Sequence, residues 1–226
     1  MKIHSIFESI SGEAGPVIKQ GAWTTFIRTQ GCPLNCDYCD TKESQNPEAG
    51  IEMTVEEIVK SCFTKNVLVT GGEPLIQLEM RELLPLLIYS GHVVQVETNG
   101  SLFPLPAVSN VGYVVDVKCP CSGMDYKMLS PGSFTNAIGL ASVFSIVSLK
   151  FVVRDSKDVR FAMWYIKEIS QQIDGIDYIF SPVNPDQGVN KVGLVPEITS
   201  RLQEINPKLT DQLIISVQMH KILQLP

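Results

Sequence analysis

Three cysteines, Cys32, Cys36 and Cys39, lie within one short polar run of the chain. A structural tetrahedral metal site uses four protein ligands, whereas a cubane iron-sulfur cluster held by three thiolates leaves one iron open to a small molecule. We therefore expect the three thiols to hold a 4Fe-4S cluster with an open iron and to mark a catalytic centre. Three free thiols, or zinc with a distant fourth ligand, would be the alternative.

The elements that must position such a site alternate along the whole chain. Short β-branched runs predict strands, and the stretches between them have the spacing of amphipathic helices. The predicted strands are Trp23–Arg28, Val67–Thr70, Val93–Glu97, Tyr113–Lys118, Leu149–Val153, Tyr178–Ser181 and Leu213–Val217, and the predicted helices are Val55–Phe63, Leu75–Tyr89, Lys157–Ile173 and Leu194–Ile205. This alternation predicts an α/β fold with a parallel sheet, either doubly wound or curled into a barrel. The run Thr54-Val55-Glu56-Glu57 predicts a capping box at the start of the first helix.

Composition limits the classes of protein to consider. The 226 residues suit one domain, 1–226, and a formal net charge of -6 favours a small-molecule substrate over nucleic acid. No apolar run approaches the roughly 18 residues of a membrane span, and the first residues lack the features of a secretion signal. We therefore expect a cytoplasmic protein whose six cysteines are reduced.

The three remaining cysteines have ordinary explanations. Cys62 falls on the apolar face of a predicted helix, where a buried thiol is common. Cys119 and Cys121 flank a proline, and an auxiliary metal site there would need further clustered ligands that the nearby sequence does not offer. We predict structural roles for both, with the auxiliary site as the alternative.

The CxxxCxxC spacing, with Tyr38 before the last cysteine, resembles the signature of the radical S-adenosylmethionine enzymes. Thr70-Gly71-Gly72-Glu73-Pro74, which alone would be a tight turn before a helix, is similar to the motif that contacts the methionyl group of the cofactor in that superfamily. The resemblance implies that S-adenosylmethionine binds the open iron. It also implies a reduced partial β/α barrel of TIM-like type, in which reactive groups gather at the carboxyl ends of the strands.

Further polar motifs end three predicted strands, namely Glu97-Thr98-Asn99-Gly100, Asp116-Val117-Lys118 and Ser181-Pro182-Val183-Asn184. Taken alone, each would be a solvated strand end. The first two offer groups suited to a ribose or a carboxylate, and the resemblance places the third beside the adenosine. The cofactor-binding residues predicted in this way are Tyr38, Gly72, Glu73, Glu97, Asp116, Val117, Lys118, Ser181, Pro182, Val183 and Asn184.

Local features narrow the resemblance to one family. They are Ile10-Ser11-Gly12-Glu13-Ala14-Gly15 and Phe26-Ile27-Arg28 before the cysteines, Asp40-Thr41 after them, and the ending His220-Lys221-Ile222-Leu223-Gln224-Leu225-Pro226. Together with the superfamily motifs they resemble the 7-carboxy-7-deazaguanine synthases of queuosine and 7-deazapurine biosynthesis. One departure is that family members commonly have Gln-Gly-Glu-Gly where this chain has Ser11-Gly12-Glu13-Ala14, and the shorter Ser11 cannot make a glutamine-type amide contact.

The resemblance implies a lyase that converts 6-carboxy-5,6,7,8-tetrahydropterin to 7-carboxy-7-deazaguanine and ammonia through a 5'-deoxyadenosyl radical. It further implies a requirement for magnesium, a flavodoxin-like or ferredoxin-like electron donor, and a homodimer. The rival enzyme is a glycyl-radical-activating enzyme with a large protein partner. The non-enzymatic alternative is a zinc or iron-sulfur binding module.

The resemblance also assigns substrate and magnesium ligands. Thr41 offers Mg²⁺ a hard hydroxyl oxygen beside the cluster loop, although alone it would be a turn residue. Arg28 could grip a carboxylate or a pterin edge, with a surface salt bridge as the alternative, and His220 could equally be a surface residue. The predicted substrate contacts are Ile10, Ser11, Gly12, Glu13, Arg28, Thr70, His220 and Pro226.

Overall fold

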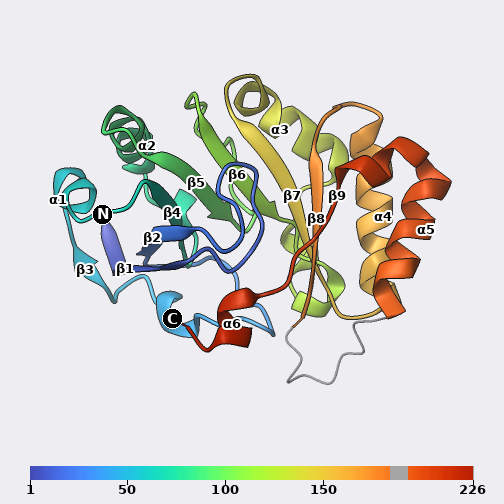
Figure 1. The fold of residues 1–226 in the computed structure, drawn as a ribbon, viewed down its shortest axis with the longest axis horizontal. Coiled ribbons are helices and arrows are strands. Elements are labelled where there is room, and N and C mark those ends of the chain that lie inside the picture. The colour runs from blue at the N-terminus through green and yellow to red at the C-terminus, as the bar shows by residue number, and fades with distance from the viewer. Residues whose placement is uncertain (184–192, 226) are drawn as a thin grey trace.

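The computed structural model describes residues 1–183 and 193–225, apart from the side chains of 139–144, 220 and 221. One sheet with the strand order β3-β1-β2-β4-β5-β6-β7-β8-β9 runs through this part of the chain (Figure 1). The strands are β1 Lys2–Ile10, β2 Trp23–Thr29, β3 Ile51–Glu52, β4 Asn66–Gly71, β5 Val93–Thr98, β6 Val111–Asp116, β7 Ile146–Val153, β8 Asp177–Pro182 and β9 Leu213–Ile215. The α-helices are α1 Val55–Lys60, α2 Met80–Tyr89, α3 Pro131–Phe144, α4 Ser156–Ser170, α5 Leu194–Ile205 and α6 Met219–Leu223.

The strand order decides between the two predicted architectures. From β2 through β4 to β9 every neighbouring pair is parallel and the order never reverses. A doubly wound sheet reverses its order at a switch point, whereas a barrel keeps one direction. The sheet therefore confirms the partial β/α barrel, left open between β3 and β9 in the described part of the chain.

The predicted strands form the parallel part of the sheet, and the structure adds an antiparallel edge that the sequence did not indicate. β1 pairs antiparallel with both β2 and β3. Antiparallel neighbours need no crossover helix, so β1 and β2 are joined directly by a loop. Sequence reasoning missed β1, β3, α3 and α6, and it placed the start of α2 at Leu75, where a short 3-10 turn precedes the helix.

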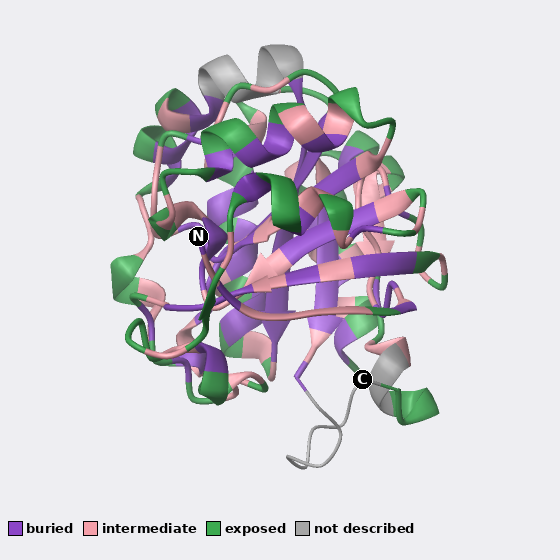
Figure 2. Ribbon diagram, turned by 90° about the vertical axis from the view of Figure 1, so that its left-hand side faces the viewer, coloured by how far each residue is buried: buried purple, intermediate pink, exposed green. Residues whose placement is uncertain are grey.

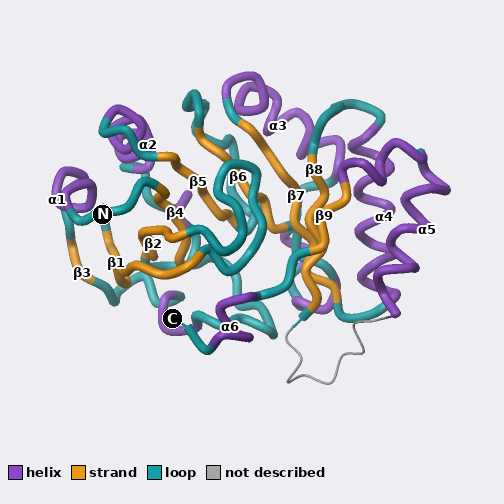
Figure 3. Tube along the Cα trace, viewed as in Figure 1, coloured by secondary structure: helices purple, strands orange, loops and turns teal. Residues whose placement is uncertain are grey.

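Alternation along each strand separates the core from the inside of the barrel. On β5, Val94 and Val96 are fully buried in the apolar core, whereas Gln95 and Glu97 face the barrel interior. The helices α1 to α5 lie along the outer side of the curved sheet (Figures 1 and 3). Figure 2 accordingly shows buried residues in the strands and in the helix faces towards them, with exposed residues on the outer faces of the helices.

The loop between β1 and β2 packs inside the barrel, where it crosses β6 in Figure 1. The backbone N–H of Ile18 donates to Oε1 of Gln95 at 3.1 Å, and Ile18 is buried. A Cβ at Gly15 would overlap the Gln95 side chain, and one at Gly112 would lie 2.5 Å from Cγ2 of Val17. The two glycines therefore allow the loop to lie directly on β5 and β6.

The first helix begins as predicted. The Thr54 hydroxyl accepts from the Glu57 N–H at 3.2 Å, and the Thr54 N–H donates to the Glu57 carboxylate at 2.8 Å. This reciprocal pair confirms the capping box and fixes the start of α1 at Val55. None of the described helices is long and apolar enough to span a membrane.

Core packing of α2 gives a stability prediction. Leu87 is 0% exposed in the core under this helix, whereas Leu78, just before the helix, is 78% exposed. We expect Leu87→Ala to lower the free energy of unfolding by about 2–5 kcal/mol, because it removes buried methyl groups and leaves a cavity. Leu78→Ala should change it by less than about 0.5 kcal/mol. Chemical denaturation of the two variants checks this, and equal losses would contradict the assigned packing.

Candidate active site

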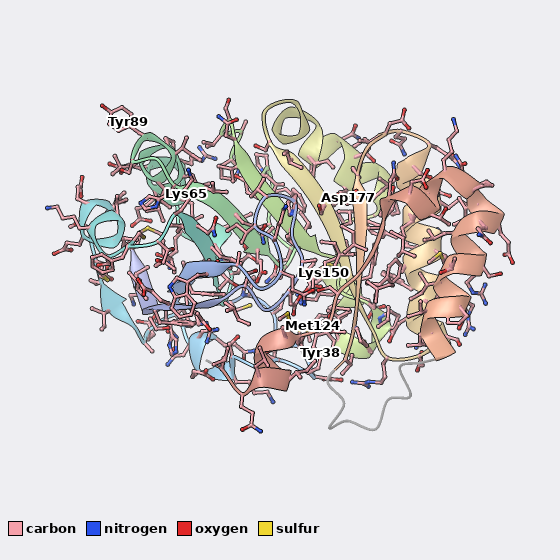
Figure 4. The ribbon with its side chains drawn as sticks, in the orientation of Figure 1. Tyr38, Lys65, Tyr89, Met124, Lys150 and Asp177 are labelled. Carbon is pink, nitrogen blue, oxygen red and sulfur yellow. The ribbon has the colours of Figure 1, made fainter. Side chains whose placement is uncertain are left out.

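The carboxyl ends of the parallel strands meet at one pocket, which we call the barrel pocket. Its lining includes the three cysteines of the predicted cluster together with Arg28 and Lys150. In Figure 4, Lys150 and Tyr38 lie towards the end of the barrel where α6 is found. Tyr89, which ends α2, lies towards the opposite end. The predicted gathering of polar groups at the carboxyl ends of the strands is therefore what the fold produces.

The cysteines lie on the loop that follows β2. Cys36 is buried and the other two are half-buried, and all three are free thiols. The N–H of Cys39 donates to the carbonyl of Cys36 at 3.1 Å, and the N–H of Cys32 donates to the carbonyl of Gln45 at 3.1 Å. The Asn99 amide donates to Sγ of Cys32 at 3.5 Å. Backbone and amide contacts thus hold this loop against the strand ends.

The surroundings of the thiols suit a cluster better than a single ion. No three of the described His, Cys, Asp and Glu side chains converge tightly enough to hold one metal ion. A cubane makes no such demand, because each thiolate binds a different iron. Burial raises the pKa of Cys36 to about 11, and the Lys118 ammonium opposes that rise and so favours the thiolate that a metal needs. Three thiols lining one pocket therefore fit a cluster with an open position.

The two-glycine motif packs against the cysteine loop. The N–H of Glu73 donates to the carbonyl of Gly31 at 2.8 Å, and a Cβ at Gly72 would overlap that same carbonyl. The Glu73 carboxylate is fully buried and accepts from the N–H of Leu75, the hydroxyl of Thr98 and the N–H of Asn99 at 2.7 to 2.9 Å. Glu73 thus ties two predicted motifs together, and its contact with a cofactor stays a prediction.

Glu13 and Lys150 form an ion pair inside the pocket, with 11% of the Glu13 side chain and 9% of the Lys150 side chain exposed. The second carboxylate oxygen of Glu13, Oε1, accepts from the amide of Gln218 at 2.9 Å. Burial disfavours the charged form of Glu13, but the adjacent Lys150 ammonium outweighs it and holds the pKa of Glu13 below its usual value. Burial also disfavours the charged form of Lys150. The carboxylates of Glu13, Asp116 and Glu97 more than compensate for this, so the pKa of Lys150 is raised.

Glu97 also lines the pocket but has a different environment. Its Oε2 accepts from the Thr70 hydroxyl at 3.2 Å. Burial, reinforced by the nearby Glu13 and Asp116 carboxylates and opposed by Lys150, raises the pKa of Glu97 to about 7. A group of this kind can exchange a proton near neutral pH.

Asp116 and Lys118 form a second charged pair at the end of β6. Nζ of Lys118 donates to Oδ2 of Asp116 at 2.8 Å and lies 5.6 Å from the centre of the Tyr38 ring. The other oxygen of Asp116 and the Tyr38 hydroxyl are buried and have no hydrogen-bond partner among the described residues. Burial raises the pKa of Tyr38, so its hydroxyl remains a proton donor. Unpaired groups of this kind suit a polar ligand, because they cost free energy until they are paired.

Arg28 faces the pocket from β2. Its guanidinium lies 5.2 Å above the Phe7 ring, and Phe7 in turn stacks on Phe26. Nε of Arg28 is buried without a partner, and no ion pair joins Arg28 to another described residue. A surface salt bridge therefore does not describe this residue, whose position suits binding of a carboxylate or a planar edge.

The structure brings most of the remaining predicted residues to this pocket. Ile10, Ser11, Gly12, Thr41, Thr70 and Val183 line it. Val117 does not, because its side chain is buried in the core on the helix side of the sheet, and Ser181 and Pro182 also lie off the lining. Asn184, the side chain of His220 and Pro226 are outside the described residues.

Sequence reasoning missed two residues that the site uses. Lys150 and Gln218 both line the pocket and hold Glu13. Lysine in the apolar run Leu149-Lys150-Phe151 was an available signal, because an ionisable residue in a buried strand needs a partner. Gln218 had no signal, since it comes from the segment after β9 and reaches Glu13 only through the fold.

Cys62 lies in the core as predicted, and Cys119 and Cys121 also make contacts within the fold. Sγ of Cys62 donates to the Ile58 carbonyl at 3.3 Å in the core. Cys119 is fully buried, and Sγ of Cys121 donates to the Val152 carbonyl at 3.5 Å. These contacts give all three thiols structural roles within the described part of the chain.

Comparisons with known proteins place the chain in a family. Residues 26–113 match the Radical SAM superfamily. A 7-carboxy-7-deazaguanine synthase of Methanospirillum hungatei is 34% identical over 230 residues, which cover all of this chain and 86% of that protein. The chain belongs to the 7-carboxy-7-deazaguanine synthase family. A second family member, from Clostridium acetobutylicum, is 36% identical over 100% of this chain and 96% of its own length.

Two solved structures share the fold of this family member. QueE from Escherichia coli superposes with a TM-score of 0.65 at 20% identity, covering 97% of this chain and 94% of that protein. Streptococcus suis SuiB bound to S-adenosylmethionine superposes with a TM-score of 0.51 at 13% identity, covering 83% of this chain and 48% of SuiB. Membership of this family makes the chain a radical S-adenosylmethionine enzyme, with the cluster and S-adenosylmethionine as its implied cofactors. The shared fold is a partial β/α barrel.

Close packing at Gly72 gives a prediction for cluster loading. A Cβ at this position would overlap the Gly31 carbonyl and lie 2.7 Å from the Ser44 carbonyl oxygen, so Gly72→Ala must displace the cysteine loop. We expect less iron and acid-labile sulfide per chain after anaerobic reconstitution. Gly132→Ala is the matched control, because a Cβ there meets nothing within 4 Å. Wild-type iron content in Gly72→Ala would show that the loop does not depend on this contact.

Proposed function

We propose that this chain rearranges 6-carboxy-5,6,7,8-tetrahydropterin to 7-carboxy-7-deazaguanine with loss of ammonia. The observation that carries the proposal is that one pocket joins the three cluster thiols to the Glu13–Lys150 pair, Glu97 and Arg28. Family membership supplies the reaction class, and the pocket supplies charged groups for a polar heterocycle that carries a carboxylate.

The residues of the pocket divide the task between cofactor and substrate. When bound at Cys32, Cys36 and Cys39, the reduced cluster with S-adenosylmethionine would supply a 5'-deoxyadenosyl radical. The absence of a side chain at Gly72 permits close approach of the methionyl group to the backbone. Tyr38 and Asp116 have unpaired buried oxygens that suit the polar parts of the cofactor.

On the substrate side, the Glu13 carboxylate accepts hydrogen bonds from the N–H groups of the pterin edge, and the Arg28 fork donates to a carboxylate or a ring edge. Ile10, Ser11, Gly12 and Thr70 complete this wall, with His220 and Pro226 as further proposed contacts. The surrounding barrel would have to exclude water during the reaction, since this protects a radical from side reactions.

Two proposed partners follow from the reaction and the family. A flavodoxin-like or ferredoxin-like protein would deliver the one electron that the cluster needs. A homodimer is proposed as the assembly, with residues 1–226 forming a single radical S-adenosylmethionine domain in each copy.

A coupled product assay tests the proposed function. The protein is reconstituted anaerobically and incubated with S-adenosylmethionine, a reductant and 6-carboxytetrahydropterin, with and without magnesium. We expect 5'-deoxyadenosine and 7-carboxy-7-deazaguanine to form together without a protein substrate. Deoxyadenosine alone would leave a radical enzyme with another substrate, and neither product from an intact cluster would overturn the proposal.

Magnesium is proposed to bind at Thr41, which lines the pocket beside the cysteine loop. Its hydroxyl makes no capping hydrogen bond to the short turn Lys42–Ser44 and so remains available to a hard cation. Magnesium there would organise the substrate carboxylate and favour the rearranging conformation.

We expect Thr41→Ala to weaken the activation of product formation by magnesium by roughly tenfold or more, because the cation loses a protein oxygen ligand. The measurement is the product rate against magnesium concentration at fixed substrate. Thr199→Ala on α5, whose described hydrogen bond is to the Val195 carbonyl at 3.0 Å, is the control. An unchanged magnesium response in Thr41→Ala would remove this residue from the site.

A further inference from the structure

Two carboxylates in the barrel pocket have neighbours of opposite character. Glu13 meets a donor at each oxygen, namely the Lys150 ammonium at Oε2 and the Gln218 amide nitrogen at Oε1. Neither the ammonium nor the amide NH₂ can accept a hydrogen bond, so a proton on either oxygen of Glu13 would face a donor. The geometry therefore favours Glu13 as an ionised acceptor.

Glu97 has no cation of its own. Its described hydrogen bond is the one with the Thr70 hydroxyl, and its negative neighbours are Glu13 and Asp116. Lys150, the positive group that lowers the pKa of Glu97, is in direct contact with Glu13 instead. A partly buried carboxyl with two negative neighbours and a shared cation is favoured in its neutral form.

Apart from Arg28, which makes no ion pair with a described residue, the charged groups around this pair leave one cation, Lys150, for two carboxylates. Nζ of Lys118 already donates to Oδ2 of Asp116 at 2.8 Å. The other charged groups that line the pocket are Arg28 on β2 and Asp40 in the cysteine loop, and Asp40 makes the ionised form of Glu13 less favourable. Lys150 on β7 thus decides how negative charge is distributed between the loop after β1 and the end of β5.

We propose that Lys150 is a positioning residue that gives Glu13 and Glu97 opposite hydrogen-bonding roles, Glu13 as a charged acceptor and Glu97 as a neutral donor. The inference rests on the proposed function and deepens it. A 2-amino-4-oxopyrimidine ring, the edge of a pterin, presents N–H donors beside a carbonyl acceptor. The pocket would present the complementary pair, which selects this ring over one whose donors and acceptors are exchanged.

The test is binding of pterin-6-carboxylate, measured by calorimetry on the cluster-loaded protein with S-adenosylmethionine from about pH 6 to about pH 9. Glu97→Gln is the informative variant, because its amide keeps a donor at every pH. The ligand's own titration is common to both proteins and cancels in the ratio of their affinities. Above a pKa of about 7, wild-type affinity should fall relative to Glu97→Gln by up to roughly tenfold per pH unit.

Lys150→Met and Lys150→Arg test the positioning role. Without the ammonium, the pKa of Glu13 rises, so Lys150→Met should bind at least roughly tenfold more weakly and should lose further affinity as the pH falls. Lys150→Arg keeps the positive charge and should restore the affinity for pterin-6-carboxylate at low pH. A residue that only supports the fold would lower affinity equally at every pH.

The outcomes separate the inference from the proposed function. Parallel pH profiles for wild type and Glu97→Gln, or unchanged binding by Lys150→Met, would overturn the inference while leaving the proposed function in place. A wild-type protein that binds the pterin at no pH and forms no deazaguanine would overturn both. If Lys150→Met does not fold, as judged by thermal unfolding, the comparison with Glu97→Gln decides alone.

Discussion

Burial of charge at the carboxyl ends of the strands is the constraint on which the site depends. An ionised side chain removed from water is stable only when an opposite charge and hydrogen bonds compensate it. Lys118 forms an ion pair with Asp116 at the end of β6, and Lys150 on β7 forms one with Glu13 from the loop after β1. The Glu13–Lys150 pair joins two segments far apart in the sequence and so also fixes their relative positions, whereas the Asp116–Lys118 pair lies within one strand end.

A second link joins the motif loops without using a cation. The Glu73 carboxylate receives three protein donors from two segments, and the Glu73 backbone holds the cysteine loop through the Gly31 carbonyl. Burial raises the pKa of Glu73, and the backbone donors of Asn99 and Leu75 counter the rise. The cluster loop and the strand end carrying Asn99 are therefore positioned by one side chain between them.

The wall opposite the cysteines is assembled from the two ends of the sequence. The N–H of Met219 and the Gln20 amide both donate to the Gly12 carbonyl at 2.9 Å, and the Ser216 hydroxyl accepts from the Ala14 N–H at 3.0 Å. These contacts hold the short loop that carries Glu13. Gln95, inside the barrel, also holds this loop by accepting a hydrogen bond from the Ile18 N–H. The shorter Ser11 of this chain bonds the Glu13 carbonyl at 3.1 Å, so it shapes the loop locally.

What the sequence determined by itself were local patterns. The cysteine spacing, the two-glycine motif and the capping box at Thr54 depend on neighbouring residues, and α5 begins and ends where the periodicity predicts. The core strands were found because buried parallel strands are continuous apolar runs. By contrast, β1 is mostly half-buried, and α3 has small and apolar residues around its whole circumference, so neither carries a clear period.

Only the tertiary structure decided the direction of β1, the barrel rather than the doubly wound sheet, and the roles of Lys150 and Gln218. Each depends on pairing between residues that are far apart in the sequence, which no local period records. The distribution of charge between Glu13 and Glu97 is decided in the same way. It depends on which carboxylate lies against the one available ammonium, and that distance exists only after the strands have assembled.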